Sequence, residues 1–258
     1  MATKNDFNSD GTQKGYDNIK RNKELIKTLF DTPEHKIYQE KKKKTQKRKE
    51  RTYKFTSLGG SGKAVQFLIF SNVLIYILGF IVGTPFLFSH FAGFPMFSPF
   101  FRIWQPVTSM FLHGGFLHIA FNMFVLWQFG KYLEELWGTK KFLIFYIIAG
   151  VFSGILCSLL SIAPAVGASG AICGLLAAYA FLEPDAKILL FFFIPAKIKP
   201  CVIWFGILSA VFGILSIFDP ALGFGIANFG HLGGLLAGAA ISYFWLKKDI
   251  LRNYNRLV

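Results

Sequence analysis

The sequence has few cysteines, and none of them is placed as in a disulfide framework or a metal site. Cys157, Cys173 and Cys201 make an odd number, each lies within or at the edge of an apolar run, and no Cys-x-x-Cys pair occurs. Disulfide scaffolds and structural zinc sites depend on such spacings. We therefore expect no disulfide core, no metal and no cofactor.

Charged residues are scarce after residue 63, which leaves long stretches without any. The chain is 53% hydrophobic and holds 31 Phe, far more than a soluble domain of 258 residues needs. Several apolar runs reach the roughly 17–25 residues that a membrane-spanning helix requires. The composition thus excludes an ordinary soluble domain and predicts an all-α polytopic membrane protein.

Six apolar runs predict six transmembrane helices. They cover residues 64–83, 116–133, 142–161, 165–182, 201–218 and 222–246. Between the first two, residues 84–114 are apolar but interrupted by four prolines, so they cannot form one helix. We expect this segment to lie half submerged, against protein or along the interface. Residues 188–195 are apolar but too short to span, which indicates a membrane-surface loop.

The first 63 residues form a basic segment with too few apolar side chains for a core. They hold 17 Lys and Arg against 8 Asp and Glu, so we expect a mostly disordered cytoplasmic leader. A basic patch is able to bind nucleic acid, but beside a membrane span it favours anionic lipid. The predicted organisation is this leader at 1–63, a six-helix domain at 64–246 and a short basic cytoplasmic tail at 247–258.

The basic residues also predict the orientation of the chain in the membrane. With six spans, 27 of the 28 Lys and Arg residues fall on the side of the two termini, and only Arg102 falls on the other. In membrane proteins the cytoplasmic loops carry the excess of Lys and Arg. Both termini are therefore expected in the cytoplasm.

Three of the runs contain strongly polar side chains at a similar depth. Ser169 stands near the head of the fourth run, His118 and Asn122 in the second, and His231 in the sixth. A serine framed by glycines is usually a packing feature, since a hydroxyl in a membrane helix often bonds back to its own helix. Histidine and asparagine are costly in hydrocarbon and indicate function more often. Together the four residues, all in the outer half of the bilayer, suggest one buried site.

Two ridges of small residues predict that the fourth and sixth helices meet. The ridges have a small residue at every fourth position: Gly170, Gly174 and Ala178 in one, and Gly230, Gly234 and Gly238 in the other. Such ridges let two helices approach closely. Ser169 and His231 each lie one position away from a ridge, where a hydrogen bond between them is expected.

A serine and a histidine in contact have the groups that nucleophilic catalysis needs. Ser169 would attack a carbonyl, and His231 would accept the proton of its hydroxyl. The Ser169 backbone N–H, the Asn122 amide and the His118 ring would stabilise the developing oxyanion. No Asp or Glu is placed in an outer half-span, so the arrangement would be a dyad rather than a triad.

The polar residues stand in three motifs: Gly-x-Ser-Gly at 167–170, His-x3-Asn at 118–122 and His-x2-Gly-x3-Gly at 231–238. In their order and spacing, residues 64–246 resemble the rhomboid family of intramembrane serine proteases. The resemblance implies Ser169 as nucleophile, His231 as base, and His118 and Asn122 as oxyanion donors. It also implies a half-submerged first loop and supporting roles for His113, Gly167, Gly170, Gly234 and Gly238. Glu134 matches a buried loop glutamate of the family, although its position equally suits an exposed helix-end carboxylate.

Two positions depart from the family pattern. Gln105 follows Trp104 where many bacterial members have an arginine, so the network around that arginine must differ. Cys173 stands one turn after Ser169, where an aromatic residue often stacks on the histidine. This second departure leaves the orientation of His231 open.

These observations predict an intramembrane serine endopeptidase that cleaves transmembrane segments of other membrane proteins near the outer face, in a bacterial cytoplasmic membrane. Two alternatives are a catalytically inactive relative that binds transmembrane helices and a small transporter or channel. Inactive relatives typically lose the serine or the histidine, and this chain keeps both. Intramembrane His and Asn also line transport pathways, but the two halves of the sequence show no internal repeat.

Overall fold

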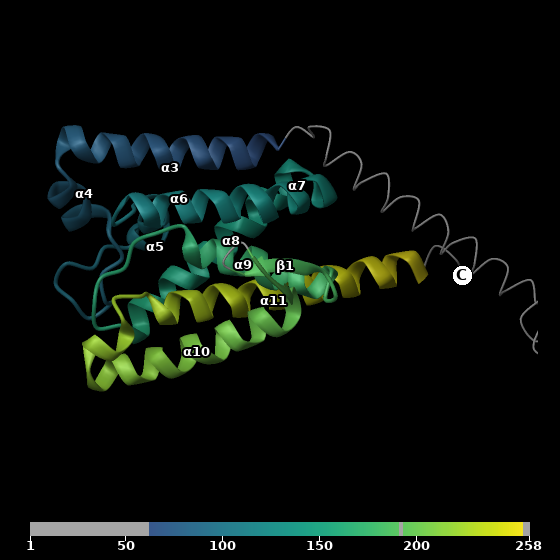
Figure 1. The fold of residues 1–258 in the computed structure, drawn as a ribbon. Helices are drawn as coiled ribbons and strands as arrows, with labels where there is room; N and C mark the ends of the chain where they lie inside the picture. Colours follow the sequence, from purple (N-terminus) through teal and green to yellow (C-terminus); the bar gives the residue numbers. More distant parts are fainter. Residues whose placement is uncertain (1–61, 191–192, 255–258) are drawn as a thin grey trace, which may run out of the picture. The chain divides into compact units, whose positions relative to one another are not determined.

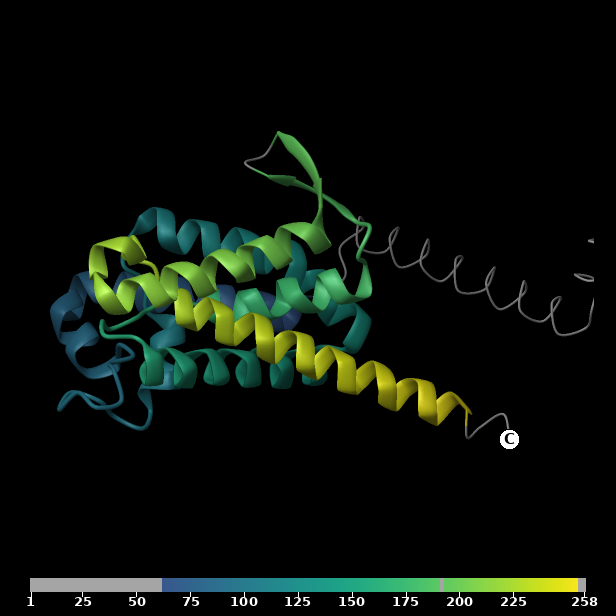
Figure 2. The same ribbon diagram turned by 90° about the horizontal axis from the view of Figure 1, so that it is seen from below.

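The computed structural model describes residues 62–190 and 193–254, without the side chains of Leu190 and of residues 246–254. Nearly all of the predicted leader and the last four residues of the predicted tail lie outside the described residues. Within the described part the long helices lie side by side with their axes roughly aligned (Figures 1 and 2).

The described residues are mainly helical. In chain order the elements are α3 (Lys63–Val82), α4 (Thr84–Phe91), α5 (Gln105–Thr108), the 3-10 helix η1 (Ser109–Phe111), α6 (Phe116–Val125), the π-helix η2 (Leu126–Gly130), α7 (Lys131–Trp137), α8 (Thr139–Leu160), α9 (Ser169–Leu182), β1 (Lys187–Leu190), β2 (Ile194–Lys197), α10 (Ile198–Phe218), the 3-10 helix η3 (Pro220–Gly223) and α11 (Asn228–Tyr254). The all-α prediction is confirmed only in part: the described residues are mostly helical, but they also hold one two-stranded sheet.

Three of these helices, α3, α8 and α10, are long and apolar enough to cross a membrane. A fourth span results if the segments Gln105–Phe111 and Phe116–Trp137, bent by 96° relative to each other, are counted together. α9 is apolar but has only 14 residues. By length and composition, the described residues thus hold three to four candidate spans rather than the six that the sequence predicts.

Two predicted spans begin later than the apolar pattern indicates. Residues 165–168 precede α9 because Gly167 adopts a φ of 127°, a conformation outside the helical region. The run at 222–227 is likewise not part of α11, because Phe224 and Gly225 both have positive φ values, 54° and 65°. An apolar run sets where a chain is buried, whereas backbone conformation sets where its helix begins.

A buried carboxylate holds the first long helix. The oxygens of Glu134, on α7, accept hydrogen bonds from the backbone N–H groups of Ala64 at 2.9 Å and Val65 at 3.0 Å. They also accept a bond of 2.7 Å from the Thr139 hydroxyl. The first N–H groups of a helix lack partners within the helix and attract negative charge. Of the two positions considered for Glu134, the buried one is therefore correct.

The proline-interrupted segment at 84–114 folds into short helices joined by irregular chain, as its prolines require. Pro85 and Pro106 stand in the first turns of α4 and α5, where the missing N–H costs nothing. Gln105 is fully buried in this segment. Its carbonyl accepts from the N–H groups of Arg102 at 3.0 Å and Phe94 at 3.3 Å, and its amide donates to the Phe100 carbonyl at 3.0 Å. A neutral amide thus organises this loop.

The same segment is hydrogen-bonded to the loop that precedes α9. Gly93 and Ala165 exchange two backbone bonds of 2.9 Å, and the Gly167 N–H donates to the Ser109 carbonyl at 2.9 Å. These bonds hold the entry to α9 from outside the helix itself, and so hold the position of Ser169.

The predicted contact between the two ridges is confirmed at α9 and α11. A Cβ added at Gly234 would collide with the Gly170 carbonyl, and one added at Gly238 would collide with Gly174. On the α8 side, the buried Ser153 hydroxyl donates to the Gly230 carbonyl at 2.7 Å. Three helices therefore meet where only small side chains fit.

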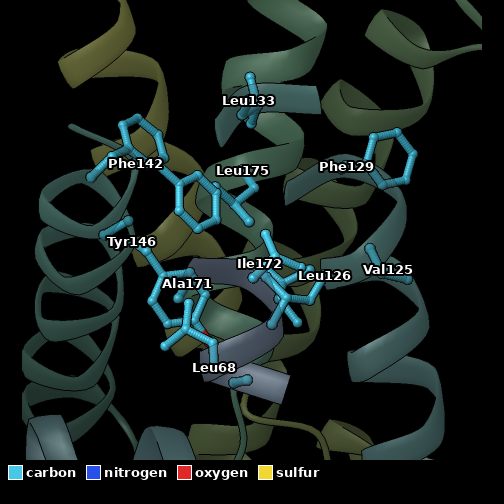
Figure 3. Close-up of a cluster of buried hydrophobic side chains, with 14 of the residues drawn as sticks. Leu68, Val125, Leu126, Phe129, Leu133, Phe142, Tyr146, Ala171, Ile172 and Leu175 are labelled. Atoms are coloured by element: carbon cyan, nitrogen blue, oxygen red, sulfur yellow. The ribbon is translucent and has the colours of Figure 1, made fainter. Parts of the chain in front are cut away.

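A core of large apolar side chains packs between the helices (Figure 3). Phe142 and Tyr146 come from α8, Leu175 from α9 and Leu126 from η2, and all four are fully buried. Their burial fixes α8 and α9 against η2, and so orders the helices that carry the polar residues.

The predicted surface loop at 188–195 contains a β-hairpin, which projects sideways from the helices (Figure 2). Lys187 pairs with Lys197 at its base, and Ile188 pairs with Ala196. Lys197 also forms an exposed ion pair of 2.8 Å with Asp185, which lowers the pKa of that carboxyl. Strand pairing was not predicted, since an apolar run of this length is read as a strand only when its partner is recognised.

Candidate active site

Ser169 is the first residue of α9, so its backbone N–H lies outside the hydrogen-bond ladder of the helix. The chain turns into the helix at Gly167, whose φ of 127° disfavours any residue with a side chain. The Ser169 side chain is only half-buried. Its hydroxyl thus stands at a helix N-terminus, where the helix dipole favours negative charge.

His231 lies opposite, in the first turn of α11. Its Nε2 atom is 2.8 Å from the Ser169 Oγ, a hydrogen-bond distance. The close approach of Gly234 to Gly170 brings the two helices near enough for this contact. The expected pairing of Ser169 with His231 is therefore present in the geometry.

In the described part of the chain, no third side chain orients the His231 ring through its other nitrogen. Nδ1 is buried there and has no hydrogen-bond partner. In a triad a carboxylate would accept from this nitrogen and fix the ring. Among the described residues the geometry is therefore a Ser169–His231 pair with no third polar group at Nδ1.

His118 reaches the same place from the first turn of α6. Its Nδ1 accepts a hydrogen bond of 3.4 Å from the Gly114 N–H, so the proton of the neutral ring belongs to Nε2. A Cβ added at Gly167 would lie 2.8 Å from that Nε2 and 3.6 Å from the Ser169 Oγ. The N–H edge of His118 and the Ser169 hydroxyl thus both border Gly167, whose missing side chain leaves room for the ring.

Asn122 is buried one turn further along α6. Its Nδ2 donates to the backbone carbonyl of His118 at 3.0 Å. This bond uses one of the two amide hydrogens and leaves the other for a second acceptor. The bond lies within one helix rather than across two.

His113 stands behind His118. The two rings meet edge to face, with centroids 5.0 Å apart and an interplanar angle of 64°. His113 is buried, at 3% exposure. Its contact with the His118 ring is consistent with a supporting position.

Two neighbours of the site were not predicted from the sequence. The Ser153 hydroxyl lies between Gly170 and Gly230. The sequence signal for it would have been a small polar residue four positions after Ala149, on the same face of α8. The ring of Phe205, on α10, lies 5.5 Å from that of His231. One phenylalanine among 31 carries no signal of its own in the sequence.

No group of three His, Cys, Asp or Glu side chains that could hold a metal ion occurs within residues 62–190 and 193–254. Cys173 is buried in an apolar cluster with Ala177 and Leu235. The groups gathered here are a hydroxyl, imidazoles and an amide, which is a set for acid–base and nucleophilic chemistry.

Comparison with known sequences decides the family. A family model described as "Rhomboid domain" matches residues 101–248, more than half of the chain and all three motifs. This chain belongs to the rhomboid family. It is thus a membrane protein whose helices are apolar enough to cross the bilayer.

This rhomboid has relatives of known name among bacteria. It is 34% identical over 180 residues to "Rhomboid protease GlpG" of Yersinia pestis (strain Pestoides F), an overlap that covers 70% of this chain and 61% of the relative. It is 31% identical over 138 residues to "Rhomboid protease GluP" of Bacillus subtilis (strain 168), covering 52% of this chain and 24% of the relative. The rhomboid described here therefore spans less than two thirds of either relative.

Proposed function

We propose that this rhomboid is an intramembrane serine endopeptidase that cleaves transmembrane segments of other membrane proteins with a Ser169–His231 dyad. The observation that carries the proposal is the 2.8 Å distance between the Ser169 Oγ and the His231 Nε2, on neighbouring apolar helices. Both side chains are half-buried, so they remain accessible from the protein surface. The printed names of the relatives, rhomboid proteases, support the same activity.

In the first step His231 Nε2 takes the proton of the Ser169 hydroxyl as Oγ attacks the scissile carbonyl carbon. The carbonyl oxygen then carries the negative charge of a tetrahedral intermediate. The Ser169 N–H is the first of α9, so it would donate a hydrogen bond to this oxygen at the positive end of the helix dipole.

Two side chains supply the remaining donors for the oxyanion. His118 presents its Nε2–H beside Gly167, as the bond at its Nδ1 requires. Asn122 has one amide hydrogen left after its bond to the His118 carbonyl. Donors that are already oriented stabilise the developing charge without further reorganisation.

The protonated His231 then donates its proton to the leaving amine nitrogen, and the peptide C–N bond breaks. Ser169 is left as an acyl ester. Water attacks this ester with His231 again as base, which frees the second product and restores the hydroxyl. No group beyond the dyad and the oxyanion donors is needed for the proton balance.

The same proposal includes a topology. α3, α6 with α7, α8, α9, α10 and α11 would be six membrane segments of a domain at 64–246, with the loop at 84–114 half submerged. The basic leader at 1–63 and the tail at 247–258 would lie in the cytoplasm, as the charge distribution supports. The leader would contact anionic lipid of a bacterial cytoplasmic membrane.

This orientation puts Ser169 toward the outer face, where cleavage would occur. A substrate helix hides its carbonyls in backbone hydrogen bonds, so it must unwind locally before Ser169 can attack. Substrate segments with Gly, Pro or other small residues near their outer end would meet this requirement most easily.

The test is a serine-directed fluorophosphonate applied to the purified protein, followed by mass spectrometry of the labelled peptide. We expect label on Ser169 of the wild type and none on Ser169→Ala or His231→Ala. Ser158→Ala, which removes a buried serine of α8, is the matched control and should label normally. Cleavage of a transmembrane reporter by Ser169→Ala would overturn the dyad. Absence of both labelling and cleavage in the wild type would point to an inactive relative.

A further inference from the structure

We propose that Phe205 of α10 holds the imidazole of His231 in the plane that faces Ser169, and so acts as a positioning residue. The inference rests on the proposed function for its catalytic meaning, but its geometric part stands separately. It starts from the absence of any hydrogen bond, within the described residues, that fixes the His231 ring at Nδ1. An imidazole whose only hydrogen bond is at Nε2 can still turn about its Cβ–Cγ bond, so another contact must fix the plane of the ring.

The residue one turn after Ser169 cannot do so. Cys173 is short, is buried, and packs against Ala177 and Leu235. Val202 of α10 fills the remaining space of that cluster. Cys173 therefore has no ring to place against the imidazole.

The ring comes from α10 instead. The centroids of Phe205 and His231 are 5.5 Å apart, and their planes are inclined by 36°. This separation lies within the range of about 4.5–7 Å over which aromatic rings interact. Rotation of the imidazole out of its plane would drive it against the phenyl ring, so the contact limits the motion that the hydrogen bond leaves free.

The neighbouring residues fix where the phenyl ring stands. A Cβ added at Gly206 would lie 3.2 Å from the Leu235 side chain, so α10 and α11 are in direct contact at this level. Leu235 lies one turn after His231 on the same face of α11. The pairs Gly206–Leu235 and Phe205–His231 are thus adjacent, and the first sets the separation of the second.

The contact also matters once the histidine is charged. During catalysis His231 becomes an imidazolium, and a cation within about 6 Å of an aromatic ring centroid is attracted by the face of that ring. The Phe205 ring centroid is 5.5 Å from that of His231, within this range. It therefore both limits rotation and stabilises the protonated state.

The test compares three variants by turnover of a fluorescent reporter with Gly and Pro near the outer end of its transmembrane segment. Phe205→Leu keeps an apolar side chain but removes the ring. We expect kcat to fall about tenfold, which corresponds to about 1.4 kcal/mol, with KM little changed. Phe205→Tyr keeps the ring and should restore kcat to within about twofold.

Trp204→Leu is the control, since it removes a neighbouring, 63% exposed aromatic side chain that has no described ring contact with His231. Its kcat should equal that of the wild type. A second readout is the ¹⁵N signal of the His231 ring in selectively labelled protein, assigned with His231→Asn. Phe205→Leu should shift and broaden it, whereas Trp204→Leu should not.

The outcomes separate the two proposals. Full activity and an unchanged His231 signal in Phe205→Leu would overturn the positioning role. A loss in Phe205→Tyr equal to that in Phe205→Leu would also overturn it, because the ring would then not be what matters. If the wild type neither cleaves nor accepts the fluorophosphonate, the protease proposal fails, and the ¹⁵N signal still decides whether Phe205 orients His231.

Discussion

At the scale of single residues, the site depends on a glycine whose missing side chain leaves room for a neighbouring ring. Gly167 has no side chain, so the His118 ring can occupy the space in which a Cβ would stand. The motif spacing predicts which residues are used but not this clearance, since it arises from the positive φ of Gly167 and the separate placement of α6. His118, Asn122, Ser169 and His231 were all identifiable as polar residues in apolar runs, whereas Phe205 was not.

Asn122→Ala should slow cleavage without abolishing labelling of Ser169. One oxyanion donor in a soluble serine protease contributes about 10²–10³ in kcat, or about 2.7–4 kcal/mol. The loss here should be smaller, because His118 and the Ser169 N–H remain. Hydrogen bonds between membrane helices average only about 0.6 kcal/mol, and we expect the bond of Asn122 to its own helix to contribute no more.

Turnover and thermal unfolding of the same purified Asn122→Ala protein decide the matter. A lower kcat at an unchanged Tm supports the oxyanion role. A lower Tm at unchanged turnover would remove Asn122 from the active site and leave it as a helix-stabilising residue.

At the scale of the elements, the glycine contact between α9 and α11 determines the distance between the two candidate catalytic residues. The four-residue spacing of small residues predicts this contact correctly from the sequence. The pattern did not predict that α9 begins only at Ser169, because periodicity carries no information on the bonds from Ser109 and Gly93 that hold the preceding loop.

Gly234→Ala should therefore both destabilise the protein and reduce its activity. The added methyl group would collide with the Gly170 carbonyl, and overpacking of this kind costs about 1–3 kcal/mol. Helices that move apart to relieve the collision also separate Ser169 from His231. Gly115→Ala is the control, since its Cβ would meet nothing within 4 Å. Wild-type turnover in Gly234→Ala would contradict the view that this contact sets the dyad.

The carboxylate of Glu134 ties α3 to α7, and its removal should affect stability more than catalysis. Glu134→Gln replaces an acceptor of two backbone N–H bonds by a group with one acceptor oxygen. An unsatisfied buried donor costs about 1–3 kcal/mol, so Tm should fall. None of the described partners of Glu134 is a candidate catalytic residue, so kcat per folded molecule should persist. Asp185→Asn, in an exposed pair, should leave Tm unchanged.

At the scale of the whole molecule, the orientation in the membrane follows from the charge census rather than from any contact. Since 27 of 28 Lys and Arg residues fall on one side of a six-segment topology, both termini should be cytoplasmic. Tags at Met1 and Val258 should resist protease added outside intact cells and be cleaved after lysis. Cleavage of either tag in intact cells would overturn the topology and the outer-face position of Ser169 with it.

The shortness of α9 has a consequence for where a substrate is cut. Fourteen residues extend about 21 Å at 1.5 Å per residue, whereas the hydrocarbon layer is about 30 Å thick. In the proposed topology Leu182 would lie at the inner boundary, so α9 would set the depth of the cut from the cytoplasmic side. Four leucines inserted into the inner half of a substrate helix should move the cut by four residues, and the same insertion in the outer half should leave the cut bond unchanged. The reverse result would mean that the distance is measured from the outer surface. The expected result would mean that the distance along the substrate helix selects the peptide bond first, and the local sequence second.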